Sequence, residues 1–233
     1  MEKPHKFPST THLAWLGEGK VRGDKVMSPP EAVVFLDRTL VIEEKMDGAN
    51  LGISVGKDEQ LQFQNRGNRL QDRLNGQWER LRNWAAIHHS VIQRHLAMGL
   101  ILFGEWCYAR HSVAYDRLPD WFLGFDVFDT TTQRFWSTRR RNELLAALNI
   151  QAVPTIAEGR FTLSQLSSFL ELPGAYTSEQ REGLYLRAED ADWLTARAKL
   201  VRPTFTQQIA EHWMSRPLEV NRLDSAARLY LNQ

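Results

Sequence analysis

The chain has 233 residues, which fits one large domain or a domain with a small appendage. Its formal net charge of +1 excludes the global positive field of a histone-like nucleic-acid binder. A single cysteine, Cys107, excludes an internal disulfide framework and a zinc site built from several cysteines, and it is typical of a reducing compartment.

The apolar runs of the sequence are too short for a membrane span, which needs about 20 residues. The N-terminal residues 1–8 alternate charged residues with prolines and lack the apolar core of a signal peptide. We therefore expect a soluble, cytoplasmic protein with no membrane partner.

The first 38 residues contain four prolines and several glycines, which predict an irregular lead-in with short strands. Residues 39–44 are mainly β-branched or apolar and predict a strand, and residues 51–55 and 61–64 predict two more. From residue 70 to residue 96 the apolar positions recur at helical spacing, so we expect one long helix or a broken pair.

The second half of the chain predicts further elements of both kinds. Apolar runs at 100–103 and 121–128 are typical of buried strands. Ser137 is a suitable N-cap for a helix through residue 148, and Thr162 or Ser164 begins another that ends near residue 173.

Residues 183–187 and 195–201 predict the last strands, and the tail after Pro203 has a helical pattern broken at Pro217. Short strands with helices inserted irregularly favour an α+β fold with antiparallel sheets over alternating β-α-β units. We expect one domain over residues 1–202 and a short helical tail, residues 203–233, belonging to it.

Residues 41–54 are the most informative stretch, because an apolar entry and an apolar exit flank a single lysine, Lys45. Asp47 and Gly48 form the strongest short-range turn signal, so the pattern predicts a strand, a tight turn and a strand. A lysine beside this turn is fixed in position at the end of a sheet. It is either a surface lysine or a covalent nucleophile.

A nucleophilic role sets a requirement on the pKa of Lys45. A free lysine has a pKa of about 10.4 and is almost fully protonated at neutral pH. Burial or a neighbouring cation must lower that pKa before the amine can attack phosphorus or carbonyl carbon. Arg197 and Lys199, two residues apart on a predicted strand, share one face and could supply the cations.

Other stretches place charged residues at the ends of apolar strands. Either these charges meet solvent, or they build a pocket with an acid for a ribose and cations for phosphates. Separate arginine clusters, at residues 66–73, 80–82 and 139–141, are either solvated helix faces or local grips on nucleic acid.

Six stretches together resemble the covalent nucleotidyltransferases, which comprise ATP-dependent RNA ligases, DNA ligases and mRNA-capping guanylyltransferases. In chain order they are EKMDGAN (44–50), QNRGN (64–68), FGEW (103–106), FLGFDVFD (122–129), EGLYLR (182–187) and RAKLVR (197–202). Their order and spacing agree with the family. The first, third and last look most like the RNA ligase 2 branch, including small bacterial members.

The resemblance implies a role for each matching residue. Lys45 would become linked to AMP, with Glu44 and Asn50 beside it in the ATP site. Arg66 would contact ribose and later the acceptor strand, Glu105 would hold ribose hydroxyls, and Phe125 would stack on the base. Glu182 would be the metal-facing acid, and Arg197 and Lys199 would contact phosphate.

Two positions differ from the phage RNA ligase 2 enzyme. Arg197 stands where that branch usually has lysine, and Asp47 stands where the phage enzyme has histidine and DNA ligases have aspartate. DNA ligases and capping enzymes also carry an OB-fold domain after the last motif. Only about 30 residues follow Arg202 here, too few for such a barrel.

The resemblance therefore implies an α+β nucleotidyltransferase domain without an OB-fold, using ATP with Mg²⁺ or Mn²⁺. It would join the 5′-phosphate and 3′-hydroxyl ends of RNA through a lysyl-AMP intermediate, as in RNA repair. An end-healing kinase-phosphatase would be its partner in that process. Two alternatives stay open: a DNA or nick-joining ligase with the same chemistry, and a non-catalytic module that binds nucleotide or RNA.

Overall fold

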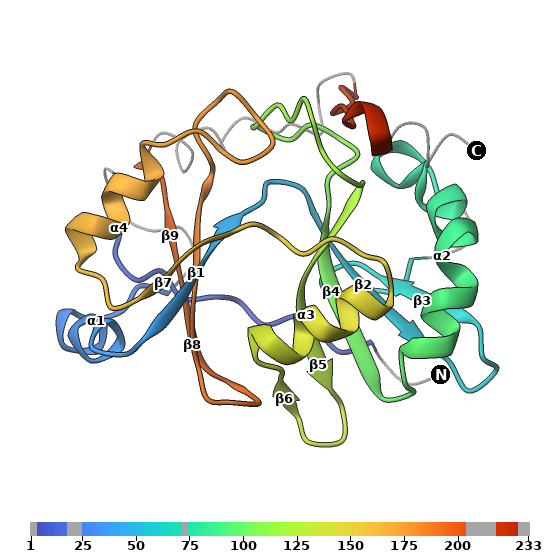
Figure 1. Ribbon diagram of the computed structural model, residues 1–233, viewed down its shortest axis with the longest axis horizontal. Helices are drawn as coiled ribbons and strands as arrows, with labels where there is room; N and C mark the ends of the chain where they lie inside the picture. The colour runs from blue at the N-terminus through green and yellow to red at the C-terminus, as the bar shows by residue number, and fades with distance from the viewer. Residues whose placement is uncertain (1–3, 18–24, 71–73, 204–217, 228–233) are drawn as a thin grey trace.

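The computed structural model describes residues 4–17, 25–70, 74–203 and 218–227. Two antiparallel sheets stand next to each other with helices on their outer sides (Figure 1). This is the α+β architecture with antiparallel sheets that the sequence predicts, and that prediction is confirmed.

The four-stranded sheet has the order β7-β1-β8-β9. Its strands are β1 (Leu40–Lys45), β7 (Thr155–Gly159), β8 (Gly183–Glu189) and β9 (Leu194–Val201). Strand β1 lies in the centre, and its last residue, Lys45, pairs with Gly183. Tyr185 pairs with Glu43 on one side and with Lys199 on the other, so residues distant in sequence become neighbours.

The five-stranded sheet has the order β3-β2-β4-β5-β6. Its strands are β2 (Ala49–Val55), β3 (Leu61–Gln64), β4 (Leu100–Trp106), β5 (Phe122–Asp129) and β6 (Arg134–Phe135). Strand β2 follows the turn after Lys45, so this turn connects the two sheets. The register pairs Asn50 with Glu105.

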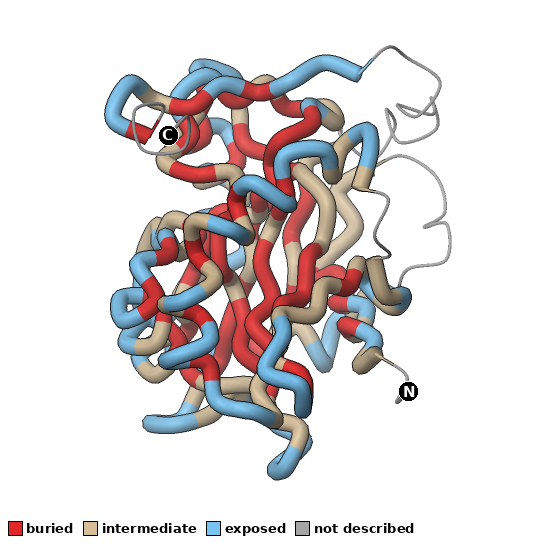
Figure 2. Tube along the Cα trace, turned by 90° about the vertical axis from the view of Figure 1, so that its right-hand side faces the viewer, coloured by how far each residue is buried: buried red, intermediate tan, exposed pale blue. Residues whose placement is uncertain are grey.

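Helices bury the outer face of each sheet in a separate core. Buried residues run along the extended segments inside the molecule, and exposed residues lie on the outer segments (Figure 2). They are α1 (Pro29–Leu36), α2 (Leu81–His95), α3 (Thr138–Ala147) and α4 (Leu163–Leu170), and a 3₁₀ turn covers Gly76–Trp78. Phe35 of α1 and Leu166 of α4 pack on Leu40 and Ile42 of β1. Trp84 of α2 and Leu145 of α3 pack against the five-stranded sheet. The inner faces of the sheets are therefore left to form a site.

Side-chain alternation along β1 decides which residues face that site. Leu40 and Ile42 belong to the helix-side core. Because successive side chains of a strand point to opposite faces, Glu43 and Lys45 point inward, whereas Glu44 points toward the helices. The same alternation places both Arg197 and Lys199 on the inner face of β9, since Ala198 and Leu200 lie in the helix-side core.

Most predicted elements are present within one to three residues of their expected ends, although the strand at residue 100 continues to Trp106. The lead-in prediction is wrong in one respect, because α1 occupies Pro29–Leu36. Strands β6 and β7 are absent from the prediction. The stretch 70–96, expected to be one long helix or a broken pair, contains the 3₁₀ turn followed by α2. The tail prediction falls largely on residues 204–217 and 228–233, outside the described residues.

Helices of the described ranges are all too short or too polar to traverse a lipid bilayer.

Candidate nucleotide-transfer site

The turn that carries Lys45 is held by a loop from the other side of the site. The Asp47 carboxylate accepts hydrogen bonds from the backbone N–H groups of Ser112 (2.7 Å) and Val113 (2.8 Å). A side chain at Gly48 would place its Cβ 2.6 Å from the carbonyl oxygen of Trp106, so this position requires glycine. The turn signal in the sequence is thus fixed by tertiary contacts.

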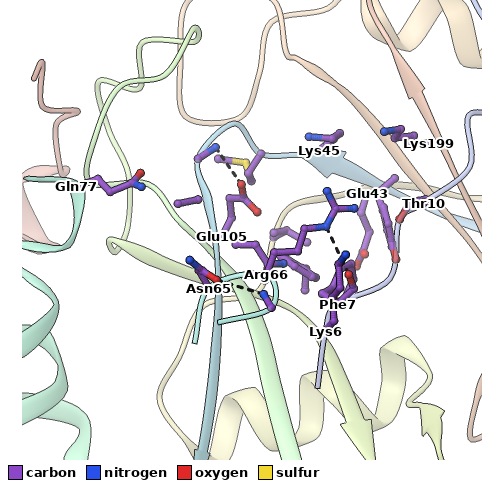
Figure 3. A pocket seen from close by; sticks show the side chains of 18 of the residues that line it. Lys6, Phe7, Thr10, Glu43, Lys45, Asn65, Arg66, Gln77, Glu105 and Lys199 are labelled. Carbon is purple, nitrogen blue, oxygen red and sulfur yellow. Dashed lines mark hydrogen bonds between the residues drawn. The ribbon is translucent and has the colours of Figure 1, made fainter. Parts of the chain in front are cut away.

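A cavity of about 710 Å³ opens between the inner faces of the two sheets (Figure 3). Seven of the predicted site residues line it: Glu44, Lys45, Asn50, Arg66, Glu105, Phe125 and Lys199. Strands of both sheets and the turn after β3 supply these residues. Glu182 and Arg197 are not among the described residues that line the cavity.

Glu182 nevertheless contacts the predicted nucleophile directly. The Nζ atom of Lys45 lies 2.7 Å from Oε2 and 2.6 Å from Oε1 of Glu182. Burial lowers the pKa of Lys45, but the Glu182 and Glu105 carboxylates outweigh burial and raise it overall. The expectation that neighbouring cations depress this pKa is therefore not met, and Lys45 is an ammonium ion here.

Burial also raises the pKa of the carboxyl groups around Lys45. Burial raises the pKa of Glu105 to about 8 and that of Glu182 to about 7, with Lys45 opposing both shifts. Repulsion from Asp47 adds to both increases, and repulsion from Glu182 adds to that of Glu105. Burial and repulsion therefore oppose ionisation of these carboxyl groups, and a cation bound beside them would favour their ionised form.

A divalent cation fits this donor set in one particular way. Within the described ranges, no group of three or more histidine, cysteine, aspartate or glutamate side chains is arranged to hold a metal ion. Mg²⁺ commonly binds through one or two carboxylates together with substrate phosphates and water. Glu182 and Glu105, whose ionised forms a bound cation would stabilise, suit that mode, and a dedicated protein cage is not required.

These pKa values predict how stability depends on pH. A carboxyl group whose folded pKa exceeds its unfolded value binds more protons when folded, so its contribution is fully present below the unfolded pKa. It is lost as pH rises through the folded values of about 7 and 8. We expect the melting temperature to fall between about pH 5 and 8, and Glu105→Gln to flatten this slope. Melting curves followed by circular dichroism test this; a rising melting temperature would contradict it.

Glu44 and Asn50 line the cavity in different ways. The Glu44 carboxylate lies on the helix side of β1, where it accepts the N–H of Ala175 at 2.9 Å and approaches Arg181 at 4.0 Å. Asn50 has a buried side-chain oxygen for which no hydrogen-bond partner exists among the described residues. The Oε1 atom of Glu44 also lacks a hydrogen-bond partner among the described residues, so the two residues differ in the face on which the unpaired oxygen lies.

Arg197 and Lys199 share the inner face of β9 but occupy different surroundings. The guanidinium of Arg197 donates to Asp126 at 3.3 Å and to the Tyr185 hydroxyl at 3.2 Å. Its Cζ also lies 4.3 Å from the centre of the Phe135 ring. Lys199 lines the cavity, whereas Arg197 is engaged in protein contacts beneath it. Their predicted joint contact with phosphate stays a prediction.

A buried charge network connects the strand of Lys45 to the residue predicted to stack on a base. Arg141 of α3 donates to Oε1 of Glu43 at 2.6 Å and to the carbonyl oxygen of Phe125 at 2.7 Å. Arg187 donates to the same carbonyl at 3.1 Å and pairs with Asp126. All four charged side chains are fully buried.

Sequence reasoning missed this network because it treated the cluster at 139–141 as one unit. Arg139 is exposed, whereas Arg141 is fully buried. The available signal was helical spacing: Arg141 precedes Leu145 and Leu148 by four and seven residues, on the face that packs inward.

The lead-in also contributes unpredicted residues to the cavity. Lys6, Phe7 and Thr10 line it, and Phe7 packs edge-on against Phe125 at 5.3 Å between ring centres. Gln77 and Trp78 contribute from the 3₁₀ turn, which the Trp106 indole N–H holds through the Gln77 carbonyl at 2.6 Å. Trp78 belongs to the stretch 70–96, whose apolar residues were expected only to form a helix. A proline-rich segment offers no periodic pattern from which such contacts could be predicted.

The fold built from these two antiparallel sheets is similar to that of a solved RNA ligase. A variant of Naegleria gruberi RNA ligase solved with ATP and Mn matches with a TM-score of 0.60 and 16% identity over 89% of this chain and 58% of that one. A second variant with ATP and Mn gives 0.59 and 18% identity over 86% and 63%. The same ligase with PPi gives 0.58 and 17% over 89% and 64%.

The family model described as RNA ligase matches residues 38–201. The chain therefore belongs to the RNA ligase family. It spans 54% to 64% of the length of the Naegleria chains that it matches. No curated protein matches it in sequence.

Proposed function

We propose that this protein is an ATP-dependent RNA ligase that joins RNA 5′-phosphate and 3′-hydroxyl ends through a lysyl-AMP intermediate on Lys45. The observation that carries the proposal is the position of the Lys45 amine, at the edge of a cavity between two sheets and within 2.7 Å of a buried carboxylate. Family membership and the ATP-containing solved relatives support the choice of nucleotide.

The first step joins Lys45 to AMP. The neutral amine attacks the α-phosphorus of ATP, a nitrogen–phosphorus bond forms, and the bond to the bridging oxygen breaks to release pyrophosphate. The amine must first lose its proton to solvent, because only the neutral amine is a nucleophile. Lys199 neutralises charge on the phosphate oxygens, and Arg197, which lies beneath it, would add to the positive charge there.

The remaining steps use the same cavity. AMP passes from Lys45 to the 5′-phosphate of RNA, and the RNA 3′-hydroxyl then displaces AMP to form the phosphodiester. Phe125 would stack on the adenine, Glu105 would hold ribose hydroxyls, and Arg66 would help to align the strand ends. Glu44 and Asn50 complete the proposed ATP site.

Mg²⁺ or Mn²⁺ is the proposed metal, held by Glu182 together with phosphate oxygens of ATP. When bound, the cation supplies positive charge that neutralises the phosphates and competes for the Glu182 carboxylate. Glu182 then no longer stabilises the ammonium form of Lys45, which leaves the amine free to act as a nucleophile.

Labelling with α-³²P ATP tests the proposal. Wild type is expected to acquire a covalent label in the presence of Mg²⁺ or Mn²⁺ that survives denaturing electrophoresis and alkali but is released by acid, as a nitrogen–phosphorus bond requires, and Lys45→Ala is expected to acquire none. Lys57→Ala, on the exposed turn before β3, is the matched control and should label like wild type. Label that persists in Lys45→Ala would contradict the mechanism, and ATP binding without any label would favour a non-catalytic module.

Sealing assays decide the substrate. We expect joining of RNA 3′-hydroxyl ends to exceed joining of DNA ends, each compared as single strands and as nicked duplexes. A preference for DNA would favour the nick-joining alternative. Ends of the required kind arise from a kinase that phosphorylates 5′-hydroxyls and a phosphatase that frees 3′-ends, so an end-healing partner in RNA repair is part of the proposal.

A further inference from the structure

Residues 5–13 form a strap that begins on the five-stranded sheet. The Phe7 N–H donates to the Arg66 carbonyl at 2.8 Å, and the Gln64 side-chain amide donates to the His5 carbonyl at 2.7 Å. The His5 ring stacks on Phe128, with 3.8 Å between ring centres. Both neighbours of Lys6 are therefore anchored.

The other end of the strap is bonded to β9 of the four-stranded sheet. The Leu13 N–H donates to the Lys199 carbonyl at 2.8 Å, and the Lys199 N–H donates to the Thr11 carbonyl at 2.9 Å. The strap thus passes from one sheet to the other along the cavity, and it bonds to the main chain of both Arg66 and Lys199.

Lys6 is the exposed residue of this strap that lines the cavity. Its side chain lies across the turn after β3, where a Cβ at Gly67 would come within 3.2 Å of the Lys6 Cγ. Figure 3 places Lys6 and Arg66 on the same side of the cavity, away from Lys45 and Lys199.

The charge of these two residues is not balanced by the part of the chain that the structure describes. Arg66 donates to neutral groups only, the Phe7 carbonyl at 3.5 Å and the Ser9 hydroxyl at 3.1 Å. Neither Lys6 nor Arg66 forms an ion pair with a carboxylate of the described residues. Two exposed cations without a counter-charge, held on anchored backbone at the edge of a cavity, suit an anion that arrives from solvent.

We propose that Lys6 is a substrate-binding residue that contacts a backbone phosphate of the RNA strand whose end Arg66 aligns. The proposal rests on the proposed function. An RNA backbone fits better than the ATP phosphates, because Lys6 is solvent-exposed at the edge, whereas ATP must place its α-phosphate at the inner pair, Lys45 and Lys199. A strap bonded to both sheets holds Lys6 in position before RNA arrives.

RNA binding measured directly tests the inference. Fluorescence anisotropy of a labelled 5′-phosphorylated RNA oligonucleotide, without ATP, gives the dissociation constant as a function of salt. Lys6→Ala is expected to weaken binding about tenfold, as for the loss of one hydrogen bond between charged groups. The slope of log affinity against log salt should become shallower by about 0.7, the value for one single-strand phosphate contact.

Three comparisons make the result decisive. Lys6→Arg should restore both affinity and salt slope, and Lys57→Ala, another exposed lysine, should leave both unchanged. In the labelling assay, the adenylylation rate of Lys6→Ala should fall by no more than about twofold, against the tenfold loss of RNA affinity. An unchanged salt slope, an equal loss of labelling, or no RNA binding by wild type would overturn the inference. Absent labelling of wild type with normal RNA binding would instead overturn only the proposed function.

Discussion

Glu182→Gln is expected to lower the pKa of Lys45 and yet to reduce its adenylylation about 100-fold, the size of effect seen when one preorganised electrostatic contact is removed. The two effects oppose each other. Glu182 raises the pKa of Lys45 more than any other charged neighbour does, so the neutral glutamine favours the free amine. Labelling should still fall, because the neutral glutamine cannot supply the carboxylate that would hold the proposed metal.

Two measurements separate these effects. The pH dependence of Lys45 modification by an amine reagent, followed by peptide mass spectrometry, reports its pKa, and labelling with α-³²P ATP reports adenylylation. Glu158→Gln is the matched control, because this exposed glutamate lies on β7, beside the strand of Lys45. Adenylylation within threefold of wild type would contradict the role of Glu182, as would an unchanged pKa of Lys45.

The site could be predicted from sequence where chemistry and local structure coincide. The Asp47-Gly48 signal correctly marked the end of β1, but the expected hairpin turn is wrong, because β1 and β2 lie in different sheets and do not pair. The close approach of the Trp106 carbonyl explains why Gly48 must be glycine. Asn50 and Glu105 lie 55 positions apart in the sequence, and strand pairing makes them neighbours. Resemblance placed both in one pocket, whereas strand periodicity alone could not specify that register.

The α1 helix shows how a correct rule led to a wrong prediction. Pro29 and Pro30 were interpreted as helix breakers, but proline is tolerated in the first turn, where its missing N–H has no partner to lose. Ser28 caps this helix, and the Glu31 carboxylate accepts the Ser28 N–H at 2.7 Å. The capping box was therefore readable in the sequence, and it outweighs the prolines.

Residues whose partners lie far away in the chain were beyond prediction. Glu43 and Arg141 are 98 positions apart, and the arginine cluster was expected to be either a solvated helix face or a contact with nucleic acid, whereas the two residues form a fully buried pair. Arg197 was predicted to face phosphate. It does lie on the inner face, but Asp126 and Tyr185 hold its guanidinium there. Alternation along a strand predicts the face of a residue and not the partner that it meets.

Arg141→Met is expected to lower the free energy of unfolding by about 3–5 kcal/mol, because it leaves the Glu43 carboxylate buried without its closest partner. The same substitution removes one of the two guanidinium groups that bond to the Phe125 carbonyl, so the KM for ATP in adenylylation should rise. Urea unfolding at neutral pH and initial labelling rates measure the two effects.

The double variant Arg141→Met, Glu43→Leu distinguishes an unpaired charge from lost packing. If the cost comes from the uncompensated carboxylate, removing it should recover part of the stability, with a coupling energy of about 1–3 kcal/mol. Recovery is expected to be incomplete, since Arg187 lies 4.0 Å from Glu43 and loses a counter-charge as well. Arg139→Met on the same helix should cost about 1 kcal/mol or less, because its partners Glu143 and Asp192 are exposed. If the losses of unfolding free energy from the two single substitutions simply add in the double variant, Arg141 stabilises the protein through its packing and not through its charge. The connection between β1 and the Phe125 backbone would then depend on Arg187 alone.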